Sequence, residues 1–418
     1  MKNANWLDNL KIRASVGSAG NGLISDAYAY LSTMSIAQSS LLNNGSVFNY
    51  TQAPSPIPKS LTWEKATTYD LGLDFEAFNG RLNFSADIYR KKTTDMYVVG
   101  EELPAVFGNS APKGNYADMR TDGWEASLSW RDSHKVAGKT LSYNIKVAVW
   151  DNTSKITRYT AKTGTLPTNY SINYYEGMTL GEMWGYKCDG LFQSDEEAQT
   201  WANYSKFTNR SATWQAGDPR YLDLNGDGYV NNGNNTIYDH GDLVKIGNTT
   251  PRYSYSIQGG VRWNGIGISM MWQGVGKRDW YPAKESGYFW GQYGRPYSMA
   301  LPWHNSDRWS PTNRGAYWPR LVGYSASDSG LILAQPNTRY VQDASYIRLK
   351  NLTIDYNFPK ELVNKIGLQA LKIYVSGENL LTFSPLKKYA KNYDPEGIYA
   401  GDADYGTNKF GSDNFGDG

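Results

Sequence analysis

The sequence contains very little of the material from which metal, disulfide or histidine-dependent sites are built. Its single cysteine, Cys188, excludes an intramolecular disulfide and any zinc site made of cysteines. Its three histidines, His134, His240 and His304, leave little for histidine-based metal or triad chemistry. No run approaches the roughly 18 apolar residues of a transmembrane helix, and residues 1–6 lack the apolar core of a signal peptide.

The chain also lacks a charge of one dominant sign. It has 42 basic and 40 acidic residues and a net charge of +2, which argues against nucleic acid as a partner. No nucleophile elbow, phosphate loop or zinc motif is present, and the carboxylates fall mainly on alternating polar positions. We therefore expect a protein that is not an enzyme.

Aromatic residues, by contrast, are abundant. They make up 14% of the chain, with 33 Tyr and 15 Trp. Such rings gather at membrane–water interfaces and on sugar-binding surfaces, because each combines an apolar face with a polar edge. The mean hydropathy of −0.60 is compatible with membrane strands, which alternate polar and apolar residues.

The clearest pattern has a period of two residues. Apolar and polar residues alternate over 69–77 and again over 82–89. Between them, Asn79-Gly80 predicts a two-residue hairpin turn, because both residues tolerate positive φ. Each predicted strand therefore has one apolar and one strongly polar face.

The same arrangement recurs further along the chain. Residues 253–263 and 266–273 alternate on either side of Asn264-Gly265, which predicts a second two-residue turn. The apolar phase slips between Leu349 and Leu352, which predicts a β-bulge near Asn351.

The connections between these strands are unequal. Each pair is closed by a short turn at one end, whereas the connections at the other end run to roughly 30–100 residues, as in outer-membrane barrels. We predict an all-β fold, an antiparallel transmembrane β-barrel with about ten strands of about 9–11 residues here. Residues 411–418 have loop composition, so we expect an incomplete barrel without its closing strand. The alternative is a soluble carbohydrate-binding β domain, which would purify without detergent.

Several strings resemble one transporter family, and they occur in order along nearly the whole chain. They include Leu61-Thr62-Trp63-Glu64-Lys65, Gly123-Trp124-Glu125, Asp223-Leu224-Asn225-Gly226-Asp227-Gly228, Ser345-Tyr346-Ile347-Arg348-Leu349, Gly377-Glu378-Asn379-Leu380 and Asp394-Pro395-Glu396. In these motifs the chain resembles the barrel of SusC/RagA-type TonB-dependent transporters.

The resemblance implies a monomeric, plugged barrel of about 22 strands in the outer membrane of a Bacteroidetes-type Gram-negative bacterium. It implies import of glycan oligomers, or less often peptides, with energy from TonB and a SusD-like surface lipoprotein as partner. Residues 1–418 would form the C-terminal portion of the barrel, and TonB would contact a plug domain that this segment lacks. We expect long extracellular loops at 152–252 and 275–344.

The first of these loops contains a candidate calcium site. Asp223, Asn225 and Asp227 offer oxygen ligands at alternate positions, and Tyr229 offers a backbone carbonyl at the seventh position. Asn234 replaces the usual acid at position twelve, so Asp242, or less favourably Asp239, would supply the missing carboxylate. The alternative is a turn rich in Gly, Asn and Asp that holds no ion.

The second loop contains a candidate substrate-binding surface. Trp290, Tyr293, Trp303 and Trp309 have aromatic faces that could stack on sugar rings, with Arg, Asn and Asp nearby to bind hydroxyls. The alternative is that these rings pack the loop itself or the lipoprotein lid.

Overall fold

One antiparallel sheet dominates the computed structural model. Its nine strands follow the order β1-β4-β5-β6-β7-β12-β13-β16-β17, so each strand of the sheet pairs with the next one along the chain. Their bounds are β1 (Leu7–Asn21), β4 (Glu64–Ala77), β5 (Leu82–Val99), β6 (Lys113–Val136), β7 (Lys139–Tyr159), β12 (Arg252–Trp263), β13 (Ile266–Lys277), β16 (Tyr346–Asn357) and β17 (Lys372–Phe383). The residues described are 6–22, 30–32, 34–52, 54, 56–57, 61–101, 103–104, 106, 111–160, 164–167, 173–201, 214–283, 286–294, 300–321, 333 and 336–398.

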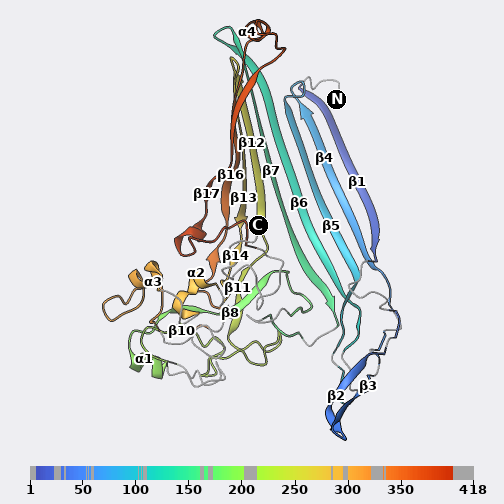
Figure 1. Cartoon of the computed structure of the whole chain (residues 1–418), viewed down its shortest axis with the longest axis vertical. Helices are drawn as coiled ribbons and strands as arrows, with labels where there is room; N and C mark the ends of the chain where they lie inside the picture. Colours follow the sequence, from blue (N-terminus) through green and yellow to red (C-terminus); the bar gives the residue numbers. More distant parts are fainter. Residues whose placement is uncertain are drawn as a thin grey trace.

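The predicted inequality of the connections is confirmed. Short connections, including α4 (Lys360–Asn364), close one end of the sheet, and the long loops gather at the other (Figure 1). Trp263 pairs with Ile266 across Asn264-Gly265, whose φ angles are 46° and 87°, so this two-residue turn is confirmed.

The predicted two-residue turn at Asn79-Gly80 is wrong in length. Ala77 pairs with Leu82, which leaves residues 78–81 in the turn. Phe78 and Arg81 are the two added residues, and Phe78 takes a φ of 58°. Its amide donates to the carbonyl of Trp6 at 2.8 Å, so a contact distant in sequence extends this turn.

The strands are longer than predicted. They run from 12 residues in β12 to 24 in β6, whereas a membrane crossing needs about 9–11. Residues 152–159 and 275–277 therefore belong to β7 and β13 rather than to the two predicted loops. The predicted bulge is confirmed, because the pairing of β16 with β17 shifts between Leu349 and Asn351.

The two faces of the sheet differ in chemistry, and cross-strand rows show this directly. One row is apolar in all nine strands and defines the apolar face. Its members are Leu10, Phe75, Phe84, Leu128, Val147, Ile257, Trp272, Leu349 and Leu381. The adjacent row, on the polar face, is polar in every strand except β7. Its members are Lys11, Asp74, Ser85, Ser127, Ala148, Ser256, Gln273, Arg348 and Thr382.

The long loops contain short ladders of their own. The pairs are β2 (Ile36–Asn43) with β3 (Ser46–Thr51), β8 (Glu182–Tyr186) with β11 (Leu243–Asn248), β9 (Cys188–Leu191) with β10 (Pro219–Tyr221), and β14 (Asp279–Trp280) with β15 (Gln342–Asp343). The helices are α1 (Asp195–Thr200), α2 (Gly287–Trp290), α3 (Pro302–Ser306) and the 3₁₀ turns η2 (Gly291–Tyr293) and η3 (Pro385–Lys388).

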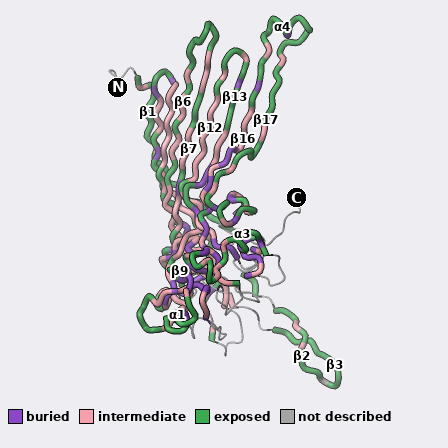
Figure 2. The backbone as a smooth tube through the Cα atoms, turned by 90° about the vertical axis from the view of Figure 1, so that its left-hand side faces the viewer, coloured by how far each residue is buried: buried purple, intermediate pink, exposed green. Residues whose placement is uncertain are grey.

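The buried core lies among these loops rather than against the sheet. Figure 2 shows buried residues concentrated at the loop end, while the strands are mostly intermediate or exposed. We call the described residues of the segments 164–251 and 278–345 the loop bundle, because their side chains form most of one hydrophobic cluster. Over the ranges that the structure describes, no helix is long and apolar enough to cross a membrane.

Candidate functional site

Aromatic rings form the centre of the loop bundle. Trp290 is 1% exposed and Tyr293 is fully buried. The Trp290 indole donates to the Pro282 carbonyl at 3.1 Å, and the Tyr293 hydroxyl donates to the Pro319 carbonyl at 2.7 Å. Neither ring therefore has a face open to a sugar, and for these two predicted binding residues the structure favours the packing alternative.

The other two predicted binding residues lie nearer the surface. Trp303 and Trp309 are both half-buried. Their indole nitrogens are enclosed, and neither finds a hydrogen-bond partner among the described residues. A Cβ placed on Gly217 would approach a ring carbon of Trp309 to 2.5 Å, so a glycine is needed beneath this ring. A role for Trp303 and Trp309 in substrate binding stays a prediction.

A buried histidine belongs to the same aromatic cluster. The ring centroids of His304 and Trp318 lie 4.3 Å apart, and His304 Nε2 is 2.7 Å from the Phe289 carbonyl oxygen. Burial lowers the pKa of His304 to about 4, so the ring is neutral at pH 7 and Nε2 donates its proton to that carbonyl. His304 is thus a packing residue with a satisfied polar edge.

The candidate calcium loop is held together by its own side chains. Asp223 accepts from the amides of Gly226 at 2.7 Å and Gly228 at 2.8 Å. Asp227 accepts from the Tyr229 amide at 2.8 Å, and Asn225 accepts from the Asp227 amide at 3.0 Å. The contacts of Asn225 and Asp227 are Asx turns, and Asp223 reaches amides three and five residues on, so these side chains orient the backbone whether or not an ion is present.

Asp242 returns to this loop as the sequence predicted. It is fully buried, and it accepts from the amides of Leu224 at 2.7 Å and Asn231 at 2.8 Å. Asp239 instead contacts the Asn234 side chain at 2.6 Å. In the part of the chain that is described, no three His, Cys, Asp or Glu side chains come together in a group that could hold a metal. Calcium binding at Asp223, Asn225, Asp227, Tyr229 and Asp242 stays a prediction.

Calcium binding can be measured on the intact receptor. If an ion binds this loop, chelation should lower the melting temperature, because an ion at 100 times its Kd stabilises the folded state by about 2.7 kcal/mol. An Asp223→Asn, Asp227→Asn variant should lose the response to chelator. An unchanged melting temperature, together with no calcium in elemental analysis, would remove the idea.

Two ion-pair clusters were not found by sequence reasoning. Buried Asp218 receives two hydrogen bonds from Arg320, at 2.6 and 3.0 Å, and so joins the two long loops. On the polar face of β16, buried Arg348 contacts both Asp394 and Glu396. The residues Arg348, Asp394 and Glu396 all occur in the recognised motifs, but only the fold shows that they meet.

Residues 3–380 match a family model described as "TonB dependent receptor-like, beta-barrel". The chain belongs to this family. It is 27% identical over 420 residues to TonB-dependent receptor P3 of Formosa agariphila, which covers 98% of this chain and 38% of that protein. It is 25% identical over 248 residues to TonB-dependent receptor SusC of Bacteroides thetaiotaomicron, which covers 57% of this chain and 23% of SusC.

Solved structures share the fold of this receptor barrel. The RagAB peptide transporter superposes with a TM-score of 0.67 at 19% identity, covering 94% of this chain and 39% of the other. Its open-open state gives a TM-score of 0.68 over 95% of this chain and 38% of the other. The chain thus spans about two-fifths of the length of the relatives that match it over nearly its whole sequence.

Family membership assigns the two faces of the sheet. In outer-membrane barrels the outward surface is an apolar band and the interior is polar. The apolar face of the receptor barrel is therefore lipid-facing and the polar face lines the lumen. The short turns lie on the periplasmic side and the loop bundle on the extracellular side, because periplasmic turns are short and extracellular loops are long.

Proposed function

We propose that the receptor containing this chain imports nutrient oligomers across the outer membrane, with glycans as the main substrate class. TonB supplies the energy, and a SusD-like surface lipoprotein assists capture. The observation that carries this proposal is the barrel wall itself, with one apolar face, one polar face and a packed extracellular loop bundle. The proposed activity is binding and passage without a covalent step.

Two features support a glycan. The polar face presents hydroxyl and amide groups, such as those of Ser85, Ser127 and Gln273, which suit exchange of hydrogen bonds with sugar hydroxyls. Trp303 and Trp309 remain half-buried, so each has an edge or face at the surface of the loop bundle. A peptide is the second candidate, because RagAB is described as a peptide transporter.

The proposal is tested with the intact receptor and its deletion strain. We expect the deletion to abolish growth on one class of oligosaccharide while growth on the constituent monosaccharide is kept. We also expect a Trp303→Ala, Trp309→Ala variant to bind that oligosaccharide about tenfold more weakly, because each lost stacking contact costs about 0.5–1.5 kcal/mol. Titration calorimetry gives the affinity.

Tyr238→Ala is the matched control, because it removes an exposed aromatic ring from the other long loop. It should leave the affinity within twofold. A growth defect confined to oligopeptides would establish the peptide alternative instead. A deletion strain that grows normally on every oligomer of both classes would contradict the proposed import function.

A further inference from the structure

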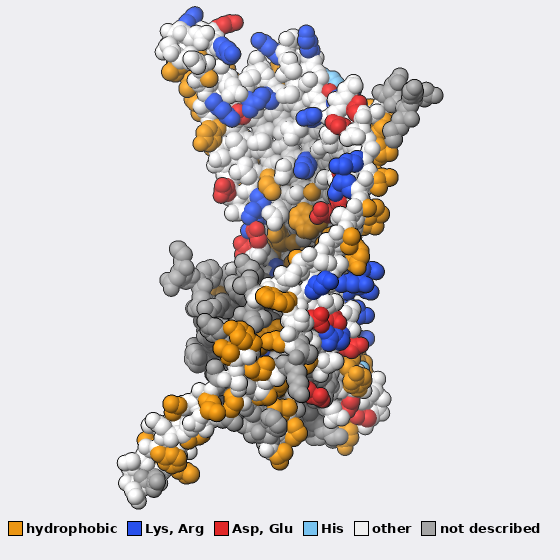
Figure 3. All heavy atoms as spheres, turned by 90° about the vertical axis from the view of Figure 1, so that its right-hand side faces the viewer, with side chains coloured by type: hydrophobic (Ala, Val, Ile, Leu, Met, Phe, Trp, Pro, Cys, Tyr) orange, Lys and Arg blue, Asp and Glu red, His pale blue; other side chains and the backbone are white. Residues whose placement is uncertain are grey.

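The apolar face changes character on the extracellular side of the membrane band. Ile88 and Trp124 lie opposite each other in one row of this face. The next two rows toward the extracellular loops carry four cationic side chains, and we call these four side chains the basic band. They are Arg90, Lys92, Arg120 and Lys155. Lys92, Arg120 and Lys155 are direct cross-strand neighbours on β5, β6 and β7. Figure 3 shows hydrophobic side chains along one margin of the sheet and Lys and Arg side chains directly beyond them.

The basic band is positive after its internal pairing is counted. Asp122 is the one carboxylate on the two rows, and it contacts Arg90 at 2.5 Å and Arg120 at 2.9 Å. Lys92 and Lys155 have no carboxylate within ion-pair distance among the residues described. One carboxylate therefore holds two guanidinium groups side by side and leaves a net positive surface. The remaining N–H groups of such a pair can bind phosphate oxygens.

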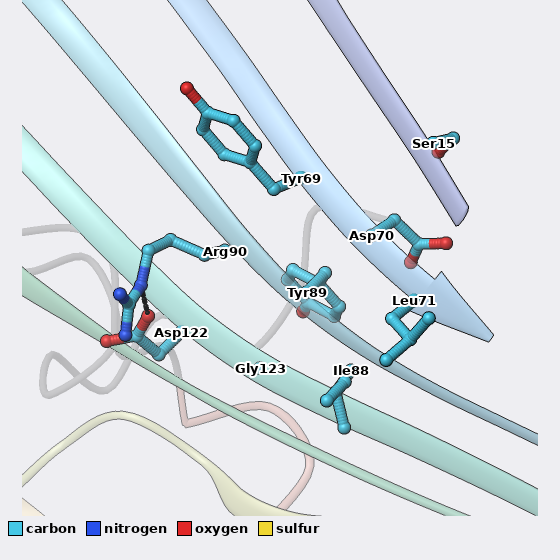
Figure 4. Close-up of a pocket in the computed structure, with 9 residues that line it drawn as sticks. All are labelled: Ser15, Tyr69, Asp70, Leu71, Ile88, Tyr89, Arg90, Asp122 and Gly123. Atoms are coloured by element: carbon cyan, nitrogen blue, oxygen red, sulfur yellow. Dashed lines mark hydrogen bonds and ion pairs between the residues drawn. The ribbon is translucent and has the colours of Figure 1, made fainter.

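A hollow lies where the basic band meets the apolar rows. It has a volume of about 550 Å³. Figure 4 shows its lining residues, which are Ser15, Tyr69, Asp70, Leu71, Ile88, Tyr89, Arg90, Asp122 and Gly123.

The lining places this hollow on the lipid-facing side. Because side chains alternate between the faces, Tyr69, Leu71, Ile88, Arg90 and Asp122 point to the apolar face and belong to two consecutive rows of it. The other lining residues, Ser15, Asp70, Tyr89 and Gly123, form the single row between those two rows. Side chains in this row point to the polar face, so the backbone of the row forms the floor of the hollow. One wall, with Leu71 48% and Ile88 58% exposed, is apolar, and the other carries the Arg90–Asp122 pair.

We propose that the hollow and the basic band bind a phosphorylated lipid of the outer leaflet. The acyl chain lies along Leu71 and Ile88, and the phosphate contacts Arg90 and Arg120. The occupant is a lipid because the cations begin where the apolar rows end, which is the depth of the lipid headgroups. A soluble anion would need no apolar wall. The inference concerns the membrane contact of the barrel and is separate from the transported substrate.

Lipid retention by the intact receptor tests the proposal. The receptor is reconstituted in bilayer discs that contain lipid A with its phosphate or lipid A from which the phosphate has been removed, and bound lipid is measured by native mass spectrometry. We expect at least tenfold greater retention of the phosphorylated form. A Lys92→Gln, Arg120→Gln, Lys155→Gln variant should lose at least tenfold of that retention, because each cation near a charged headgroup contributes about fivefold.

The matched control removes three lysines of the polar face, as Lys11→Gln, Lys91→Gln, Lys146→Gln. This control should retain the phosphorylated lipid within twofold of wild type, and the heat-modifiable gel shift shows that each variant is folded. Three results would overturn the proposal. These are equal retention of the two lipids by wild type, unchanged retention by the basic-band variant, and displacement of the lipid by inorganic phosphate at the same concentration. Even if a variant does not fold, the retention of the two lipids by the wild-type receptor still tests whether the lipid phosphate is bound.

Discussion

Replacing Asp218 with alanine is expected to lower the free energy of unfolding of the loop bundle by about 3 kcal/mol. Asp218 is fully buried and accepts both hydrogen bonds of the Arg320 guanidinium and one from the Gln215 amide. Removing it leaves a cation and an amide without an acceptor. Breaking a buried ion pair by removing one partner costs about 3–5 kcal/mol. We expect the lower end of this range, because the Arg320 side chain is 24% exposed and keeps some hydration. Urea unfolding of the intact receptor measures the loss.

The control for Asp218 is a second bidentate aspartate–arginine pair in the same bundle. Asp189 accepts from Arg220 at 2.8 and 3.2 Å, but its side chain is 35% exposed. Asp189→Ala should therefore cost under about 1 kcal/mol. Equal losses in the two variants would show that burial does not govern the strength of these pairs.

The Asp218 pair should also be visible in the pH dependence. Burial raises the pKa of Asp218 above its usual 3.8, and hydrogen bonding to Arg320 only partly offsets this. The folded state then holds the proton more tightly than the unfolded state, so stability falls as pH rises from the unfolded pKa through the folded pKa. The alanine variant should lack this fall.

A Leu128→Arg substitution is expected to destabilise the membrane-inserted barrel by about 2–4 kcal/mol, the cost of a cation in the lipid midplane. Leu128 belongs to the row that is apolar in all nine strands, so its side chain faces lipid. Refolding of the receptor into lipid vesicles, followed by the heat-modifiable gel shift, measures the change.

Ser127→Arg is the adjacent control, because one step along β6 moves the side chain to the polar face. It should refold within about 0.5 kcal/mol of wild type, as surface substitutions usually do. If Ser127→Arg were the more damaging change, the assignment of the two faces would be reversed.

Much of the sheet could be predicted from the sequence, because its strands and some of its turns are determined by residues that are close together in the sequence. Alternation over 69–77 and 253–263 fixes both the strand and its two faces, and Asn264-Gly265 carries the φ preferences of its own turn. The turn after Ala77 could not be predicted in length, because it depends on the contact between Phe78 and Trp6. Strand length was underestimated because a pattern of apolar residues ends where the membrane ends, whereas the ladders continue beyond it.

The candidate sites were predicted less well, for a physical reason. Sequence composition located the aromatic loop, but only packing distinguishes buried Trp290 from half-buried Trp303. By contrast, the return of Asp242 to the calcium-like loop could be predicted, because Asp242 lies close to that loop in the sequence. The Asp218–Arg320 pair links residues 102 positions apart, and no spacing rule reports such a contact.

The short ladders at the base of the loop bundle have a consequence for how the sheet assembles. Strands β7 and β12 are separated by residues 160–251, and joining the ends of so long a segment costs chain entropy. Glu182 pairs with Asn248 where β8 meets β11, and Asp279 pairs with Asp343 where β14 meets β15. Both pairs lie next to the ends of the long strands. Each short ladder can therefore form by extending a pair of long strands that has already formed, and this shortens the slow search for partners that are distant in sequence.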